Sequence, residues 1–219
     1  MNKNPYLVPH TQEPIKILYR DEDLILVKKP DLLLSVPGRH PLNKDCLITR
    51  IQTDFPTATM VHRLDLDTSG IMVIPLNKST HSNISRQFQE RKVFKEYEAE
   101  VFGRMNAKTG EIALPIAPDW ANRPIQVIDH HRGKSAATKF KTIQRLPRKT
   151  RLLLYPISGR SHQLRLHLQA IGHPIIGCDL YAHEKAFQMS KRLMLHATRL
   201  HLTHPSSGRP LEGYCPPDF

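Results

Sequence analysis

The sequence predicts an α+β fold, because predicted strands outnumber predicted helices and the two do not alternate regularly. Apolar residues recur at helical spacing in three short segments, whereas the predicted strands are three to ten residues long. At 219 residues, the chain is long enough for one large domain or for two closely joined halves. We expect an N-terminal arm over residues 1–14 and one catalytic domain over residues 15–219.

The first predicted element is a β-hairpin. Residues 15–19 and 24–28 are rich in apolar side chains and flank the acidic residues 21–23, which suit a turn. Residues 59–61 and 70–74 are predicted to be strands on either side of a polar loop.

Three helices are predicted from apolar spacing. The first covers residues 45–55 with Asp45 as its N-cap, and the second covers residues 79–91. The third covers residues 161–171, with Ser161 as its N-cap and a glycine directly after its end.

Residues 93–102 alternate in a way that is typical of a half-buried strand, with Tyr97 on the apolar face and three glutamates on the other. Residues 104–151 contain several prolines and many basic side chains, and we expect irregular structure there. The remaining predicted strands cover residues 152–157, 193–202 and 211–214.

The charge balance favours a polyanionic partner. The chain has 32 Lys and Arg residues against 20 Asp and Glu residues, a net charge of +12 with histidine neutral. Such an excess attracts nucleic acid at long range. The alternative is a basic protein that has no polyanionic ligand.

Several other classes are disfavoured. The three cysteines are widely spaced and form no C-x-x-C pair, which fits a reducing cytoplasm, and no apolar run approaches the ~20 residues of a membrane helix. The sequence has no Walker A loop, no G-x-G-x-x-G and no G-x-S-x-G, so neither ATP, nicotinamide nor acyl-serine chemistry is indicated. We expect no metal site, because the 13 histidines show no ligand spacing; His162 and His167 lie five residues apart.

The densest polar cluster is His62-Arg63-Leu64-Asp65-Leu66-Asp67-Thr68-Ser69-Gly70, between two predicted strands. Asp65 could act as a nucleophile or a base, and Arg63 could bind RNA beside it. The alternative is a solvated turn whose short polar side chains cap strand ends.

A second cluster, Gly159-Arg160-Ser161-His162-Gln163-Leu164-Arg165-Leu166-His167, begins the third predicted helix. Arg165 borders its apolar stripe, where a desolvated guanidinium usually has a carboxylate partner. The alternative is an arginine that reaches solvent along its aliphatic stem. In the same way, an inward Tyr97 is either a core residue or a surface on which a base stacks.

Together, H-R-L-D-x-x-T-S-G at residues 62–70, K-x-Y at residues 95–97 and G-R-S-H-Q-L-R at residues 159–165 resemble the RluA family of pseudouridine synthases. The order and spacing match, and the likeness runs from about residue 15 to residue 219. Residues 34–39 are similar to the short members that modify ribosomal and transfer RNA. Leu32 and Leu164 depart from the family pattern, where glycine and isoleucine are common.

The resemblance implies a mixed, mostly antiparallel sheet with flanking helices and a central active-site cleft. It assigns Asp65 as the catalytic aspartate, Arg165 as its partner and Tyr97 as the residue against the target uracil. Arg63 would enter the RNA stack and Leu195 would lie near the base. We also expect His62, Arg160 and His162 to contact RNA.

The function implied is that of a cofactor-free isomerase, a monomer in the cytoplasm that converts uridines in 23S ribosomal RNA, the transfer RNA anticodon stem-loop or both. Its partner would be structured RNA, with no membrane and no metal. Two rival functions are an RNA-binding protein without catalysis and an N-glycosylase that releases the base.

Overall fold

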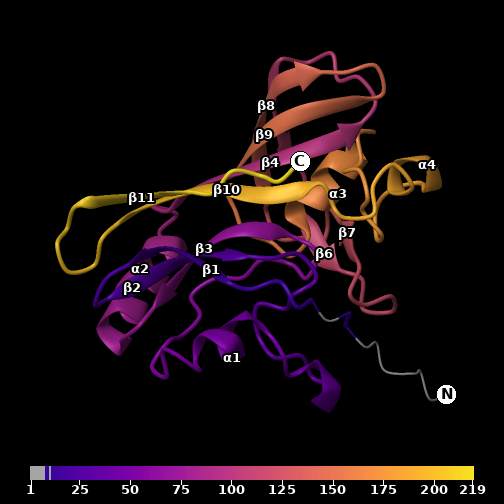
Figure 1. Cartoon of the computed structure of the whole chain (residues 1–219). Helices are drawn as coiled ribbons and strands as arrows, with labels where there is room; N and C mark the ends of the chain where they lie inside the picture. Colours follow the sequence, from indigo (N-terminus) through magenta and orange to yellow (C-terminus); the bar gives the residue numbers. More distant parts are fainter. Residues whose placement is uncertain (1–7, 10) are drawn as a thin grey trace. The chain divides into compact units, whose positions relative to one another are not determined.

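The computed structural model describes residues 8–9 and 11–219, which form two compact units (Figure 1). The first unit contains the chain up to Phe94 together with Ala197–Pro216, and the second contains Lys95–His196 together with Pro217–Phe219. Much of the predicted arm, residues 1–7 and 10, lies outside the described residues, and the single catalytic domain stays a prediction. None of the helices in the described part of the chain is long and apolar enough to span a lipid bilayer.

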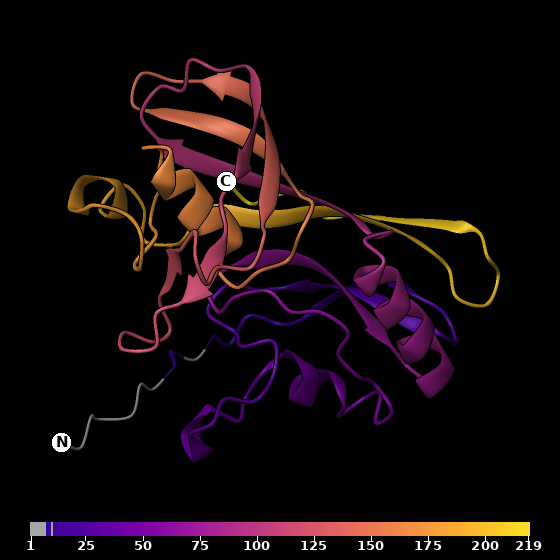
Figure 2. The ribbon, with the colours of Figure 1, turned by 180° about the vertical axis from the view of Figure 1, so that it is seen from behind.

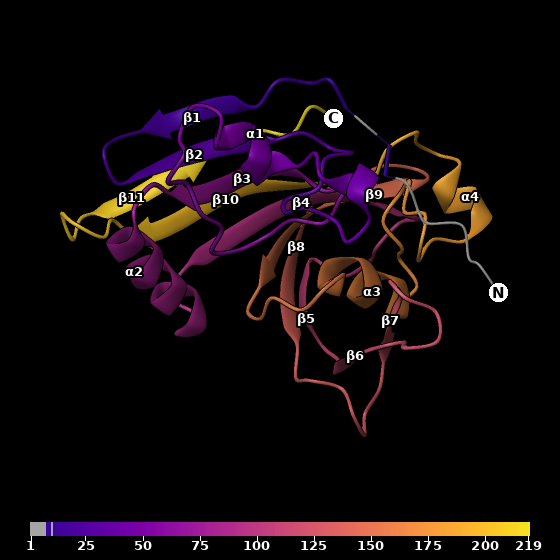
Figure 3. The ribbon, with the colours of Figure 1, turned by 90° about the horizontal axis from the view of Figure 1, so that it is seen from below.

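The first unit is built on a sheet with the order β1-β2-β3-β10, and β11 pairs with β10 (Figure 3). β1 pairs with β2, β2 pairs with β3 and β10 pairs with β11, each in antiparallel orientation. Its strands are β1 (Lys16–Arg20), β2 (Leu24–Lys29), β3 (Ser69–Pro75), β10 (Leu195–Thr203) and β11 (Pro210–Tyr214). Its helices are α1 (Leu47–Ile51), α2 (Lys78–Gln89) and the 3-10 helix η1 (Pro41–Asn43).

β2 and β3 form the core of the first unit. All seven residues of β3 are buried, as are five of the six residues of β2. Near-continuous apolar runs of this kind are typical of strands covered on both faces. α2 packs Ile84, which is 0% exposed, into the same interior.

The second unit has the strand order β4-β9-β8-β5 and a separate β6–β7 hairpin. One face of its sheet is covered by α3, whose Leu164 and Leu168 share a hydrophobic core with strand residues Ala99, Leu152 and Leu154 (Figure 2). Its strands are β4 (Phe94–Phe102), β5 (Thr109–Ala113), β6 (Ile116–Pro118), β7 (Gln126–Ile128), β8 (Ala137–Arg145) and β9 (Lys149–Pro156), and its helices are α3 (Gln163–Ala170) and α4 (Glu184–Phe187).

The prediction of an α+β fold with a mostly antiparallel sheet is confirmed. The hairpin at residues 15–28, the strand at residues 93–102 and the second helix appear as β1–β2, β4 and α2. Ala99 and Val101 of the predicted apolar face are both 0% exposed, but Glu100 between them is also buried, at 3% exposed, where it pairs with Lys149 and Arg151.

Several boundaries were predicted wrongly. α1 stops at Ile51, and the residue in front of Pro56 is restricted to extended conformations, which prevents the helix from extending to residue 55. Asp45 is not the N-cap: Cys46 occupies that position, and the Asp45 carboxylate instead accepts hydrogen bonds from Arg50 at 2.6 and 2.7 Å.

Residues 59–61 form no strand, because both edges of β3 are already paired, with β2 and with β10. Residues 104–151 are not irregular, since four strands and the start of a fifth lie there. Ser161 does not cap α3, because His162 occupies the N-cap with a left-handed φ of 55°.

Candidate active site

In the first unit, the loop that carries Asp65 leads directly into β3. The Asp65 side chain is half-buried. The backbone carbonyl of Asp65 accepts a hydrogen bond from the Thr68 backbone N–H at 3.2 Å, which closes a tight turn. The short polar side chains after it are buried: Thr68 is 2% exposed and Ser69 is 1% exposed. The loop is therefore a fixed part of the fold and not a solvated turn.

Ser35 holds the residue before Asp65. Its hydroxyl donates to the Leu64 carbonyl at 2.7 Å and accepts from the Leu64 N–H at 3.1 Å. The Ser35 carbonyl in turn accepts from the N–H of Ile48 in the first turn of α1 at 3.3 Å. A helix terminus and one buried hydroxyl thus fix the backbone on the N-terminal side of the carboxylate.

Lys29 holds the residue after Asp65. Its side chain lies at the end of β2 and is 0% exposed, and its ammonium donates to the carbonyls of Pro30 at 2.8 Å, Leu33 at 2.7 Å and Leu66 at 3.1 Å. Three carbonyl dipoles offset part of the cost of burying the charge. The backbone is therefore held on both sides of the carboxylate, at residues 64 and 66.

The motif ends in Gly70 because a side chain does not fit at this position. Its φ is +124°, and a Cβ at this position would lie 2.3 Å from the Ala197 carbonyl oxygen and 2.4 Å from the Ala197 nitrogen. The clashing atoms belong to the backbone of β10, which is paired with β3 and cannot shift without breaking the sheet. Only glycine allows β3 to start here against β10.

His62 and Arg63 behave differently. The His62 Nε2 accepts the Val73 N–H at 3.1 Å, and its ring stacks on Phe88 at 4.8 Å between centroids. His62 therefore ties the loop to β3 and α2, whereas Arg63 is exposed. Their contacts with RNA stay predictions.

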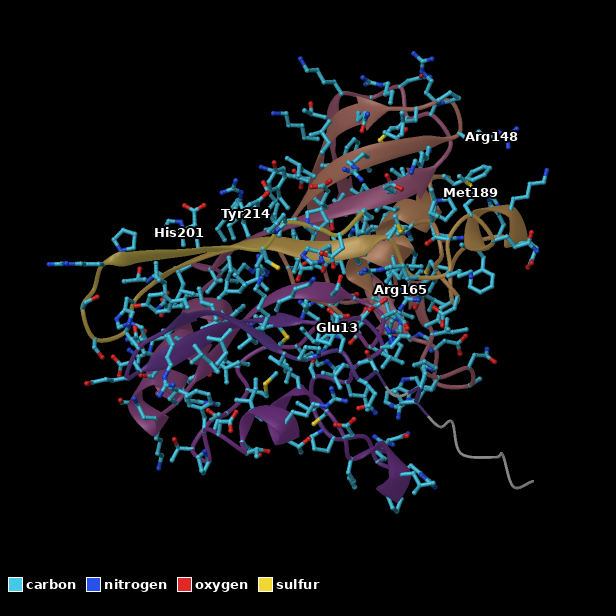
Figure 4. All side chains as sticks on the ribbon, viewed as in Figure 1. Glu13, Arg148, Arg165, Met189, His201 and Tyr214 are labelled. Atoms are coloured by element: carbon cyan, nitrogen blue, oxygen red, sulfur yellow. The ribbon has the colours of Figure 1, made fainter. Side chains whose placement is uncertain are left out.

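In the second unit, Arg165 is 2% exposed, so it does not reach solvent along its stem (Figure 4). It forms an ion pair with Asp179, and its Nε donates to the Cys178 sulfur at 3.2 Å. The guanidinium carbon also lies 5.5 Å from the Tyr181 ring centroid. The expected carboxylate partner on this unit is thus Asp179, and a role for Arg165 toward Asp65 stays a prediction.

Gln163 locks the start of α3 to β8. Its amide nitrogen donates to the Ala137 carbonyl and to the Thr138 hydroxyl, both at 3.0 Å. Its amide oxygen accepts from the Ser158 hydroxyl at 2.8 Å and from the Arg160 N–H at 3.0 Å. All four bonds originate from one side chain that is 3% exposed, so the motif glutamine positions the helix that carries Arg165.

His167 continues this network. Its Nδ1 lies 3.0 Å from the Thr138 hydroxyl and its Nε2 lies 3.0 Å from the Leu114 carbonyl. Burial lowers the pKa of His167 from its ordinary value, and the Leu114 carbonyl opposes this effect only in part. The ring is therefore neutral at physiological pH and serves the structure.

The other residues expected to contact RNA or the base make hydrogen bonds or apolar contacts within the second unit. The His162 Nδ1 lies 2.7 Å from the Tyr181 hydroxyl, and the Arg160 Nε donates to the Ser135 carbonyl at 3.2 Å. Tyr97 packs half-buried against the hydrophobic core, and Leu195, which is 3% exposed, belongs to that core. The structure thus groups Asp65 with His62 and Arg63 in one unit, and the other five predicted site residues in the other unit.

Sequence reasoning assigned no role to Ser35, Lys29 or Gln163. Gln163 was visible in the second motif, and Lys29 stood in the Lys-Pro pair that ends the first hairpin. Ser35 gave no signal, because its bonds to Leu64 span 29 positions of sequence.

Comparison with protein-family models identifies the class of protein. Residues 23–170 match the model described as RNA pseudouridylate synthase, which covers more than half of the chain and both motif loops. The chain belongs to the RNA pseudouridylate synthase family, and it is accordingly an isomerase that acts on RNA.

Individual relatives agree with this family. The chain is 49% identical over 204 residues to the dual-specificity RNA pseudouridine synthase RluA of Yersinia pestis, covering 93% of this chain and 99% of the relative. It is 46% identical to the Escherichia coli protein of the same name, covering 95% and 96%. Among solved structures, human RNA pseudouridylate synthase domain containing 1 superposes with a TM-score of 0.80 at 29% identity, covering 96% and 86%. The resemblance to the RluA family is confirmed.

Proposed function

We propose that Asp65 is the catalytic carboxylate with which this chain converts uridine in RNA to pseudouridine. The reaction breaks the N1–C1′ bond, turns the uracil and joins C5 to C1′; C5 loses its proton and N1 gains one, so atoms and electrons balance without a redox cofactor. Asp65 acts either as a nucleophile at C1′ or as a base toward the 2′ hydrogen of the ribose.

One observation carries this proposal: the backbone is held immediately before and after Asp65 by Ser35 and Lys29, two buried side chains from other segments. A reacting group gains most when its geometry is fixed before the substrate arrives. Burying a hydroxyl and an ammonium is costly, so their bonds to Leu64 and Leu66 support a role that requires a fixed loop.

Arg165 and Tyr97 complete the proposed machinery. Arg165 is proposed as the guanidinium that pairs with the catalytic carboxylate. Tyr97 is proposed to stack on the target uracil, which returns ~1–3 kcal/mol of the few kcal/mol needed to extrude a base. Arg63 is proposed to fill the gap in the RNA stack.

The proposed substrates are uridines in 23S ribosomal RNA, in the transfer RNA anticodon stem-loop, or in both, and the name of the bacterial relatives, dual-specificity, supports two RNA classes. The remaining contacts to RNA are assigned to His62, Arg160, His162 and Leu195. We expect the protein to act as a monomer in the cytoplasm. The net charge of +12 predicts that binding weakens steeply with salt.

The test is tritium release from RNA that carries uridine labelled at C5. Asp65→Asn and Asp65→Ala should abolish release while RNA binding persists, whereas Asp54→Asn, at an exposed aspartate of the same unit, should leave release unchanged. Appreciable turnover by Asp65→Ala would refute the assignment. Free uracil among the products would identify a glycosidase instead.

A further inference from the structure

The hairpin of β6 and β7 ends in a turn whose shape is fixed by its own hydrogen bonds. Seven residues, 119–125, join the two strands, and the loop projects beyond their ends (Figure 2). The Asp119 carboxylate accepts the N–H groups of Ala121 and Asn122, each at 3.1 Å, and the Asn122 amide at 2.9 Å. The backbone closes the turn through Asp119 to Ile125 and Ile125 to Asn122, each at 3.0 Å.

The tip of this turn displays Trp120. Its side chain is 69% exposed, and the Arg123 guanidinium carbon lies 3.9 Å from the ring centroid. A single exposed apolar side chain is ordinary on a protein surface. Here, however, an indole is held in place by an ordered turn and by a cation on one of its faces, which leaves its other face open to a flat partner.

The base of the hairpin is joined to the helix that carries Arg165. The Gln126 N–H donates to the Tyr181 hydroxyl at 2.9 Å, and the same hydroxyl lies 2.7 Å from the Nδ1 of His162, the N-cap of α3. Ile116 also packs with Leu166 of α3 in a small hydrophobic cluster. These contacts fix the base of the hairpin against the start of α3 within this unit.

The charge around the hairpin suits a polyanion. Arg123, Arg132 and Lys134 are exposed, and the two carboxylates of the segment, Asp119 and Asp129, are both engaged in turns. Backbone N–H groups of Arg132 and His131 hold the pKa of Asp129 at about 2. Arg132 itself pairs with Asp129 at 2.8 Å, so Arg123 and Lys134 are the cations that the segment offers to a polyanion.

We propose that Trp120 is a second contact to the substrate RNA, at which an unpaired base stacks on the open face of the indole while Arg123 binds a neighbouring phosphate. This inference rests on the proposed function, since it concerns the same RNA. An aromatic ring accepts any base, so the contact would add affinity without reading sequence. It would hold the stem-loop at a point other than the reacting uridine.

Trp120 is the single tryptophan of the chain, so tryptophan emission, excited at a wavelength that the six tyrosines do not absorb, reports on this tip alone. The first experiment titrates full-length Asp65→Asn protein with a synthetic transfer RNA anticodon stem-loop and, separately, with a ribosomal RNA hairpin. Tryptophan emission should be quenched saturably, and bound RNA should protect the indole from acrylamide. Emission and acrylamide access that stay unchanged at saturating RNA would overturn the proposal and favour a protein partner at the tip.

The second experiment measures turnover. Trp120→Ala should raise KM by about 5- to 150-fold, with kcat within about twofold, and Trp120→Phe should recover most of the loss. Arg123→Gln should lower the slope of binding against salt by about one. Tyr214→Ala is the matched control, because Tyr214 is 52% exposed with the Arg199 guanidinium carbon 4.4 Å from its ring centroid (Figure 4).

The outcomes separate the two proposals. Equal changes in KM for Trp120→Ala and Tyr214→Ala, or no change for either, would overturn the stacking contact. Normal pseudouridine formation with an unresponsive tryptophan would overturn this inference alone. Absence of pseudouridine in every RNA treated with the unsubstituted chain would refute the proposed function instead.

Discussion

Replacing Ser35 with alanine removes one oxygen atom and leaves two backbone groups of Leu64 without their partner. Both residues are buried, with Ser35 3% and Leu64 6% exposed, so water does not readily replace the hydroxyl. Each buried polar group that loses its partner costs ~1–3 kcal/mol, and because one hydroxyl serves both groups we expect a loss of about 2–4 kcal/mol in unfolding free energy. For a chain of this size, that corresponds to roughly 4–16 °C in Tm.

The same change should slow the reaction, because Leu64 precedes Asp65. A displacement of about 1 Å in a reacting group can cost ~100-fold, so kcat should fall by about 10- to 100-fold while KM changes little. Thermal unfolding and tritium release measure the two effects on one preparation. Ser79→Ala removes an exposed hydroxyl that bonds to Asn77 at 2.7 Å and serves as the control. A Ser35→Ala protein with the Tm and kcat of Ser79→Ala would refute the reasoning.

Three further predictions follow from other contacts. Gly70→Ala forces a Cβ to within 2.3 Å of the Ala197 carbonyl oxygen, so unfolding free energy should drop by about 3–5 kcal/mol; a Tm near that of the unsubstituted chain would contradict the close approach. Burial lowers the pKa of His167, so the unfolded chain binds a proton near pH ~6.5 before the folded chain does, and stability should fall as pH drops below that value. His167→Gln should flatten the curve of Tm against pH between about pH 7 and 5.5, and an unchanged curve would exclude this histidine. Tyr97→Phe should keep kcat/KM within about twofold while Tyr97→Leu lowers it about 5- to 150-fold, and equal mild effects would make Tyr97 an ordinary core residue.

The elements predicted well from the sequence are those in which local pattern and long-range packing agree. The first hairpin, β4 and α2 all carry clear period-2 or period-3.6 apolar spacing. The motif loops were also found, because their charged residues stand between apolar strands. The burial of individual residues follows the repeat less closely, since β2 is buried almost throughout and Glu100 of β4 is 3% exposed.

The missed strands lie where polar residues carry the pattern. In β8, Thr138, Phe140 and Thr142 point inward and are 0%, 7% and 7% exposed, while Lys139 and Lys141 point outward. The lysines made the segment look like an irregular basic loop, although its alternation is regular. Threonine satisfies its hydroxyl inside the unit, as Thr138 does with His167, and so replaces an aliphatic residue there.

The support of the site could not be predicted, because it depends on contacts between distant positions. Lys29 reaches Leu66 across 37 positions, and no local pattern identifies a lysine that will be 0% exposed. Such a contact follows from the fold and not from the sequence around either residue.

The strand that lies beside β3 is β10, which begins 120 positions after β3 ends. During synthesis, the ribosome therefore releases the Asp65 loop and the three strands β1, β2 and β3 well before the strand that covers their edge. Until the residues of β10 emerge, β3 presents unpaired backbone groups and Gly70 faces no neighbour. The first unit thus depends on a strand that is made 120 positions after β3, and loss of β10 would leave the edge of β3 unpaired.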